Sequence, residues 1–250
     1  MKIQLGEVIQ DQTCTIEYFF HPEGGKRGIV IVFPGGGYSH LAPHEAAPVA
    51  EKFVELGFHA AVCMYRLSPV HFPIQLEDAC NAVRYTREHA EELQVKPDKI
   101  AVLGFSAGGH LAGMVSNIPD SNQSRPDASI LCYPVLGADP EYIHRGSFKN
   151  LLGEDVPEDE YIKFSWPDVA HENTPPAFLW HTVSDTVVPA ANSIEYAMAL
   201  KKLNIDAEVH LYPKGPHGLG LGDRPGREGE FDEVKSWPML CARFLKDRGW

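Results

Sequence analysis

Cysteine is scarce in this sequence of 250 residues, and the five that occur form no Cys-x-x-Cys pair. They are odd in number and widely spaced, so we expect reduced thiols and a cytoplasmic protein rather than a disulfide framework. No group of cysteine and histidine has the spacing of a zinc site, and His44-Glu45 lacks the second histidine of the H-E-x-x-H motif. The sequence therefore predicts no metal and no cofactor.

Long apolar runs and basic residues are also lacking. No apolar run approaches the roughly 18 residues that a membrane-spanning helix needs. Residues 1–7 lack the apolar core of a signal peptide and already include the acidic Glu7. Lys and Arg number 22 against 34 Asp and Glu, which gives a net charge of −12. Such a surface repels nucleic-acid phosphates and anionic lipids, so we expect a small-molecule partner rather than nucleic acid or a membrane.

What the sequence does contain is a regular alternation of two apolar patterns. Short unbroken apolar runs, such as 28–33, are typical of strands buried on both faces, and segments with apolar residues at helical spacing separate them. Strands are expected at 14–20, 28–33, 59–64, 100–105, 128–133, 177–181 and 207–212, and helices at 43–56, 73–90, 106–116, 189–203 and 233–246. This order predicts an α/β protein of one domain, residues 1–250, with a mostly parallel sheet and helices on both faces.

The segment 137–176 interrupts this alternation. It carries Tyr142, Phe148 and Trp166 among many charged residues. We expect it to be a short insertion that lies over the carboxyl edge of the sheet. Its aromatic side chains either form the wall of a substrate pocket or anchor a long loop, and the sequence favours neither alternative.

The clearest chemical motif is Gly104-Phe105-Ser106-Ala107-Gly108, which fits the G-x-S-x-G pattern of a nucleophile elbow. A buried strand runs into it and a helical stretch of small residues leaves it, which is the strand–turn–helix setting that the motif needs. Side chains at the two glycines would collide with the neighbouring strand and helix. We therefore predict that the turn is strained and presents Ser106 as a nucleophile above the sheet.

A second glycine-rich segment, Pro34-Gly35-Gly36-Gly37-Tyr38, follows the strand at 28–33. Acyl transfer places negative charge on the former carbonyl oxygen, and fixed backbone N–H groups stabilise that charge by about 3 kcal/mol per donor. Consecutive glycines let the main chain approach a substrate closely. We assign Gly36 and Gly37 as oxyanion donors together with the N–H of Ala107, and we expect Gly35 to shape the turn.

A serine nucleophile needs a base, and the base needs an acid that orients it. Asp185 follows the strand at 177–181 and His217 follows the strand at 207–212, so both lie on loops at the carboxyl edge of the sheet. Together with Ser106 they have the chain order serine, acid, histidine. We predict that Asp185 orients His217 and that His217 takes the proton of Ser106.

Other polar residues leave alternatives open. Asp139 and Glu141 follow an earlier strand and are alternative acids. His110, on the helix after the elbow, is expected to be structural. Arg66 and Asp78 either form a buried ion pair that fixes loops near the site or are separate, solvated charges.

These segments resemble those of serine esterases with the α/β-hydrolase fold. The likeness is greatest to bacterial acetyl esterases and acetyl xylan esterases that carry a P-G-G-G-Y loop. It rests on that loop, on Tyr65-Arg66-Leu67, on the elbow with Gly109-His110, and on the segments around Asp185 and His217, and it extends from about residue 28 to 245. The resemblance implies removal of short acyl groups, above all acetyl, from sugars such as xylo-oligosaccharides.

Three other functions are weighed against this one. The first is an esterase for small esters that are not carbohydrates. The second is a serine peptidase, because the Tyr-Arg and elbow segments also resemble the catalytic domains of prolyl-oligopeptidase relatives, although no propeller domain is present to restrict access. The third is a binding or scaffold protein, but such relatives usually lose one of the three catalytic residues and this sequence keeps them all. A homo-oligomer is compatible with each.

Overall fold

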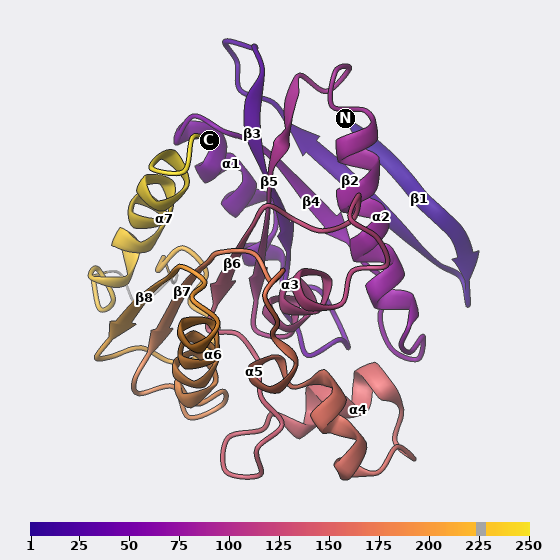
Figure 1. Ribbon diagram of the computed structural model, residues 1–250, viewed down its shortest axis with the longest axis vertical. Helices are drawn as coiled ribbons and strands as arrows, with labels where there is room; N and C mark the ends of the chain where they lie inside the picture. The colour runs from indigo at the N-terminus through magenta and orange to yellow at the C-terminus, as the bar shows by residue number, and fades with distance from the viewer. Residues whose placement is uncertain (224–228) are drawn as a thin grey trace.

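Within residues 1–223 and 229–250, the part of the chain that this computed structural model describes, an eight-stranded sheet runs through the centre of the molecule (Figure 1). Its strands lie in the order β1-β2-β4-β3-β5-β6-β7-β8. They are β1 (Lys2–Ile9), β2 (Gln12–Phe19), β3 (Arg27–Phe33), β4 (His59–Met64), β5 (Val95–Phe105), β6 (Ala128–Cys132), β7 (Ala177–Thr182) and β8 (Ala207–Tyr212). β1 pairs antiparallel with β2, and β2 with β4, whereas the strands from β4 to β8 in this order are parallel. The prediction of a mostly parallel sheet is confirmed.

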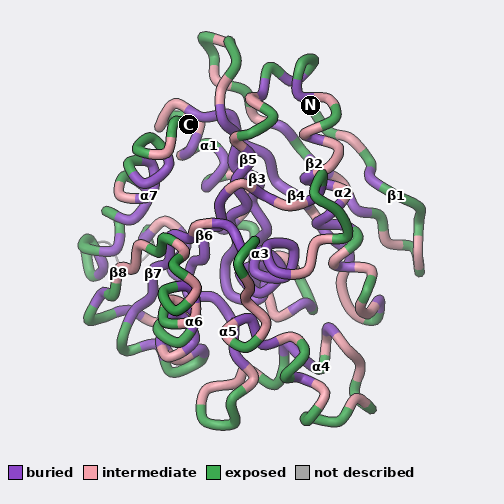
Figure 2. The backbone as a smooth tube through the Cα atoms, viewed as in Figure 1, coloured by how far each residue is buried: buried purple, intermediate pink, exposed green. Residues whose placement is uncertain are grey.

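Helices cover both faces of the sheet. On one face lie α2 (Ile74–Glu88), α3 (Ala107–Asn117) and α6 (Ala191–Lys202), and on the other lie α1 (Ala47–Glu55) and α7 (Trp237–Lys246). The side chains of β3 alternate between the two cores: Ile29 and Ile31 pack under the first layer, and Val30 and Val32 under the second. All four are fully buried, so an unbroken apolar run serves both layers. Figure 2 shows the buried backbone concentrated along these strands.

No helix in the described ranges combines the length and the apolar character that crossing a bilayer demands.

Three elements differ from the prediction. The helix expected at 233–246 is a short 3-10 turn, η3 (Val234–Ser236), followed by α7, and the helix expected at 43–56 is likewise a 3-10 turn, η1 (Pro43–Glu45), followed by α1. Pro48 lies in the first turn of α1, and proline is accommodated at the start of a helix rather than in its interior because it lacks an N–H. The sequence also fails to predict β1, because Leu5 is its one buried position and the strand has no alternating apolar pattern.

The insertion, residues 137–176, lies at the carboxyl edge of the strands, as predicted, and is largely helical (Figure 1). It contains α4 (Arg145–Leu152), η2 (Glu158–Phe164) and α5 (Trp166–Val169). Phe148 stacks on Tyr161 with ring centroids 4.9 Å apart, and Trp166 packs against His110 at 4.8 Å. All four side chains are buried, so these aromatic groups anchor the insertion to the body of the protein.

Arg66 and Asp78 form a buried ion pair. Arg66 Nε lies 3.0 Å from Asp78 Oδ1, and the backbone N–H of Arg66 donates to Asp78 Oδ2 at 2.8 Å. Arg66 Nη1 also donates to the carbonyl oxygen of Glu7 in β1 at 3.2 Å. Of the two alternatives left open by the sequence, a buried ion pair or separate solvated charges, the structure has the buried ion pair. It joins the end of β4 to α2 and β1.

Candidate active site

Four loops meet at the carboxyl edge of the central strands. They follow β3, β5, β7 and β8, and they carry the glycine loop (residues 34–38), Ser106, Asp185 and His217 in turn. Parallel strands end at the same edge of a sheet, so residues that are far apart in the sequence come together there.

Ser106 lies in a strained turn between β5 and α3. Its φ and ψ are 51° and −116°, a backbone conformation that costs on the order of 1–3 kcal/mol for a residue with a side chain. The flanking glycines are required by space: a Cβ at Gly104 would lie 2.0 Å from the carbonyl oxygen of Gly108, and one at Gly108 would lie 2.1 Å from that of Phe33. The collisions expected from the sequence, with the helix start and with a neighbouring strand, are those found.

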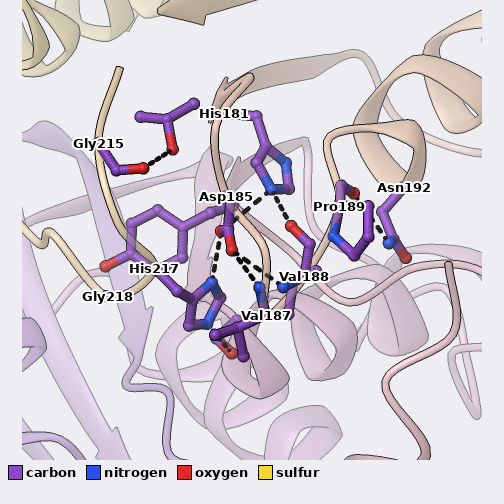
Figure 3. A network of polar contacts seen from close by, with 12 residues as sticks. His181, Asp185, Val187, Val188, Pro189, Asn192, Gly215, His217 and Gly218 are labelled. Carbon is purple, nitrogen blue, oxygen red and sulfur yellow. Dashed lines mark hydrogen bonds and ion pairs between the residues drawn. The ribbon is translucent and has the colours of Figure 1, made fainter. Parts of the chain in front are cut away.

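Ser106, His217 and Asp185 form a continuous chain of hydrogen bonds. His217 Nε2 lies 2.8 Å from Ser106 Oγ, and His217 Nδ1 donates to Asp185 Oδ2 at 2.7 Å, the second contact being drawn in Figure 3. Because Nδ1 carries the donated proton, Nε2 is left to accept the hydroxyl proton of the serine. Asp139, one of the alternative acids, instead accepts the backbone N–H of Glu141 at 2.8 Å within its own loop.

Asp185 is held as a carboxylate by donors on several sides. Its Oδ1 accepts the backbone N–H groups of Val187 and Val188 at 2.9 and 3.0 Å, and His181 Nε2 lies 3.5 Å from Oδ2 (Figure 3). Burial raises the pKa of Asp185, but the hydrogen bonds from His181 and His217 outweigh it and hold the pKa well below its usual range. The side chain that contacts the imidazole is therefore charged throughout the neutral range.

The glycine loop presents N–H groups that have no partner within the described residues. Gly36 and Gly37 adopt φ values of +128° and +63°, which favour glycine. Their N–H groups, and that of Ala107 at the start of α3, donate to no other described residue. The N–H of Gly35 donates at 2.8 Å to the Glu45 carboxylate, so Gly35 has no N–H left for a ligand.

Ser106 opens onto a cavity of about 440 Å³. Its lining includes polar side chains from the segment after the glycine loop and from the insertion, namely Ser39, His40, His44, Glu45, His144 and Asn150. The insertion thus supplies part of the wall from α4 and the residue before it. The sequence left open whether the aromatic groups of the insertion form the pocket wall or anchor the loop. Phe148 and Trp166 are buried and anchor it.

Sequence reasoning missed several residues around this cavity. Glu45 is buried beside the glycine loop, and Asn150 Nδ2 donates to the carbonyl oxygen of Gly37 at 2.8 Å. His144 caps α4 by accepting the backbone N–H of Ser147. The one signal in the sequence is the acidic residue of His44-Glu45, a pair that by itself indicates only an incomplete zinc motif. Among the described residues, no three His, Cys, Asp or Glu side chains are grouped so as to hold a metal ion.

Known proteins share both this sequence and this fold. The sequence model of a family described as BD-FAE matches residues 18–130. The solved structure of an acetyl ester-xyloside bifunctional hydrolase from Caldicellulosiruptor lactoaceticus superposes with a TM-score of 0.87 at 38% identity, over 95% of this chain and 89% of that one. This chain belongs to the esterases of the α/β-hydrolase fold. The fold and the enzyme class predicted from the sequence are thereby confirmed.

Two curated relatives of this α/β-hydrolase esterase have names that refer to xylan. Endo-1,4-beta-xylanase B of Butyrivibrio fibrisolvens is 35% identical over 220 residues, and an acetylxylan esterase of Xylanibacter ruminicola is 32% identical over 208 residues. The matches cover 82% and 81% of this chain. The chain spans 34% and 43% of the length of these two relatives, so the likeness concerns a part of each of them.

Proposed function

We propose that this protein is a serine carboxylic-ester hydrolase that removes acetyl groups from sugars such as xylo-oligosaccharides. Ser106 is the nucleophile, His217 the general base and acid, and Asp185 the residue that orients His217. Gly36, Gly37 and Ala107 donate their N–H groups to the oxyanion. The observation that carries the proposal is the hydrogen-bond chain from Ser106 Oγ through His217, 2.8 and 2.7 Å long, beside three N–H groups without described partners.

The reaction follows from the protonation of this chain. As Ser106 Oγ attacks the ester carbonyl carbon, its proton passes to His217 Nε2, and the charged Asp185 stabilises the imidazolium that forms. The carbonyl oxygen takes up negative charge next to the free N–H groups. When the tetrahedral intermediate collapses, the C–O bond to the alcohol breaks and His217 returns the proton to the leaving oxygen. Water then repeats the sequence on the acyl-enzyme and releases acetate.

The acetyl and sugar parts of the proposal have separate support. The solved relative described above is named for acetyl esters and xylosides. The two curated relatives are named for xylan and acetylxylan. The cavity beside Ser106, about 440 Å³, carries hydroxyl, imidazole and amide side chains within a largely apolar surface. These polar groups can form hydrogen bonds with sugar hydroxyls, and the apolar surface around them suits a short acyl group.

The test is an ester panel on the wild type and Ser106→Ala. The panel runs from acetyl to octanoyl 4-nitrophenyl esters and adds acetylated xylo-oligosaccharides and a peptide 4-nitroanilide. We expect acetyl to be preferred, acetate to be released from the sugars, and the rate to fall by about four orders of magnitude or more in the variant. A preference for long acyl chains would refute the sugar substrate, cleavage of the anilide alone would favour a peptidase, and an unchanged Ser106→Ala would refute the nucleophile.

A further inference from the structure

Glu45 is a buried carboxylate that the proposed chemistry does not use. Glu45 is 2% exposed and lies in η1, which residues 39–42 separate from the end of the glycine loop. Its Oε2 accepts the Gly35 N–H at 2.8 Å, and its Oε1 accepts the hydroxyl proton of Tyr133 at 2.5 Å. A buried charge is costly unless donors surround it, and here both oxygens are engaged.

Tyr133 extends this network to the loop that carries His217. The Tyr133 hydroxyl accepts the backbone N–H of Gly220 at 2.7 Å, and its ring lies against the His217 ring with centroids 5.0 Å apart. Tyr133 itself follows β6 and has a φ of 36°, so the end of that strand is bent to place it there. The Glu45 carboxylate therefore connects the glycine loop, through Gly35, to the loop that carries His217, through Tyr133.

The histidine loop (residues 213–223) needs such external contacts. Gly218 and Gly220 have φ values of 77° and 57°, and glycines leave a chain conformationally free unless other groups hold it. The neighbour of Glu45 supplies a second contact, since His44 Nε2 donates to the carbonyl oxygen of Gly218 at 3.0 Å. η1 thus contacts the histidine loop directly at Gly218 and through Tyr133 at Gly220.

We infer that Glu45 is a positioning residue that fixes the glycine loop and the histidine loop relative to each other, through Gly35 on one side and Tyr133 on the other. The inference rests on the proposed function, because it concerns where the oxyanion donors lie relative to His217. Glu45 takes no proton from the substrate and acts only through the groups that it holds. A carboxylate suits this role because both partners donate, so both of its oxygens must accept.

The test compares Glu45→Gln with Tyr133→Phe and with the double variant, using 4-nitrophenyl acetate at a temperature well below each unfolding midpoint. Glutamine keeps the shape but turns an NH₂ group toward Gly35 or Tyr133, both of which are donors. We expect kcat to fall by about 10- to 100-fold with KM changed by less than about threefold, because misplaced groups impair the transition state more than binding. The double variant should lose little more than Glu45→Gln alone, because both act on one network.

The control is Asp127→Asn. Asp127 is a partly buried carboxylate at the opposite edge of the sheet, where it accepts the Ile100 N–H at 2.8 Å and pairs with Arg87 at 2.9 Å. This variant should lower the unfolding midpoint without lowering kcat.

The outcomes separate the two proposals. A wild type whose activity depends on Ser106, with kcat unchanged in Glu45→Gln, would overturn the positioning role and leave the esterase mechanism intact. A rise in KM alone, or losses that multiply in the double variant, would overturn it as well. If Glu45→Gln does not fold, Tyr133→Phe decides in its place: a lower kcat with KM nearly unchanged supports the positioning role, and an unchanged kcat or a rise in KM alone overturns it. Activity that survives in Ser106→Ala would instead refute the mechanism itself.

Discussion

At the scale of single residues, His110 shows how burial fixes a protonation state. Its side chain is 1% exposed, accepts the Tyr38 hydroxyl proton on Nδ1 at 2.9 Å and donates from Nε2 to the carbonyl oxygen of Phe164 at 3.0 Å. Burial lowers the pKa of His110 to about 4. The neutral imidazole therefore joins the glycine loop to the insertion, which is the structural role expected for it.

This lowered pKa predicts a loss of stability in mild acid. The unfolded chain takes up the proton near pH 6.5 and the folded protein only near pH 4, so the free energy of unfolding falls as the pH drops through that window. At pH 4 the loss from this group is about 3 kcal/mol. Urea unfolding from pH 7 to pH 4 measures it. The variant His110→Gln should be less stable at pH 7 and have a shallower pH dependence, and an equal slope in both proteins would contradict the assignment.

At the scale of elements, α4 and its capping residue have two roles: one side packs against the body of the protein, and the other lines the cavity beside Ser106. Phe148 faces inward and stacks on Tyr161, whereas His144 and Asn150 line the cavity beside Ser106. The aromatic content of the insertion serves stability, and its polar residues form the wall.

Two substitutions test this division. Phe148→Ala should lower the free energy of unfolding by about 3–5 kcal/mol and leave the ratio of kcat/KM for acetyl and butyryl esters unchanged. His144→Asn keeps a side chain that caps α4, so stability should change by less than about 1 kcal/mol while the preference among acetylated sugars shifts. A changed acyl preference in Phe148→Ala, or none among sugars in His144→Asn, would reverse the two roles.

These elements also mark how far sequence reasoning reaches. The run at 28–33 and the elbow around Ser106 are local patterns whose meaning does not depend on the rest of the chain, and their strands and turn were predicted. The placement of Asp185 and His217 at one edge can be predicted because each lies on the loop after a strand that ends there. Glu45 and Tyr133 could not be, because their contact spans 88 positions and depends on the paths of three loops.

At the scale of the whole molecule, the net charge of −12 repels anionic substrates. Acetylated xylo-oligosaccharides that carry a uronic acid should therefore have a lower kcat/KM than neutral ones of equal length at low ionic strength. The difference should shrink as salt rises from about 0.01 to 0.5 M, since the screening length falls to a few ångström. A difference that does not respond to salt would point to direct contact in the cavity instead.

The distance along the chain between the reacting groups has a consequence for synthesis on the ribosome. Ser106 precedes His217 by 111 residues, and the strands β6, β7 and β8 must enter the sheet before the two meet. At 5–20 residues per second, roughly 5–20 seconds separate the translation of the serine from that of its histidine. Under the proposed mechanism, the nascent chain therefore carries Ser106 before the histidine that would activate it, and hydrolytic activity is expected only after the last strand is in place.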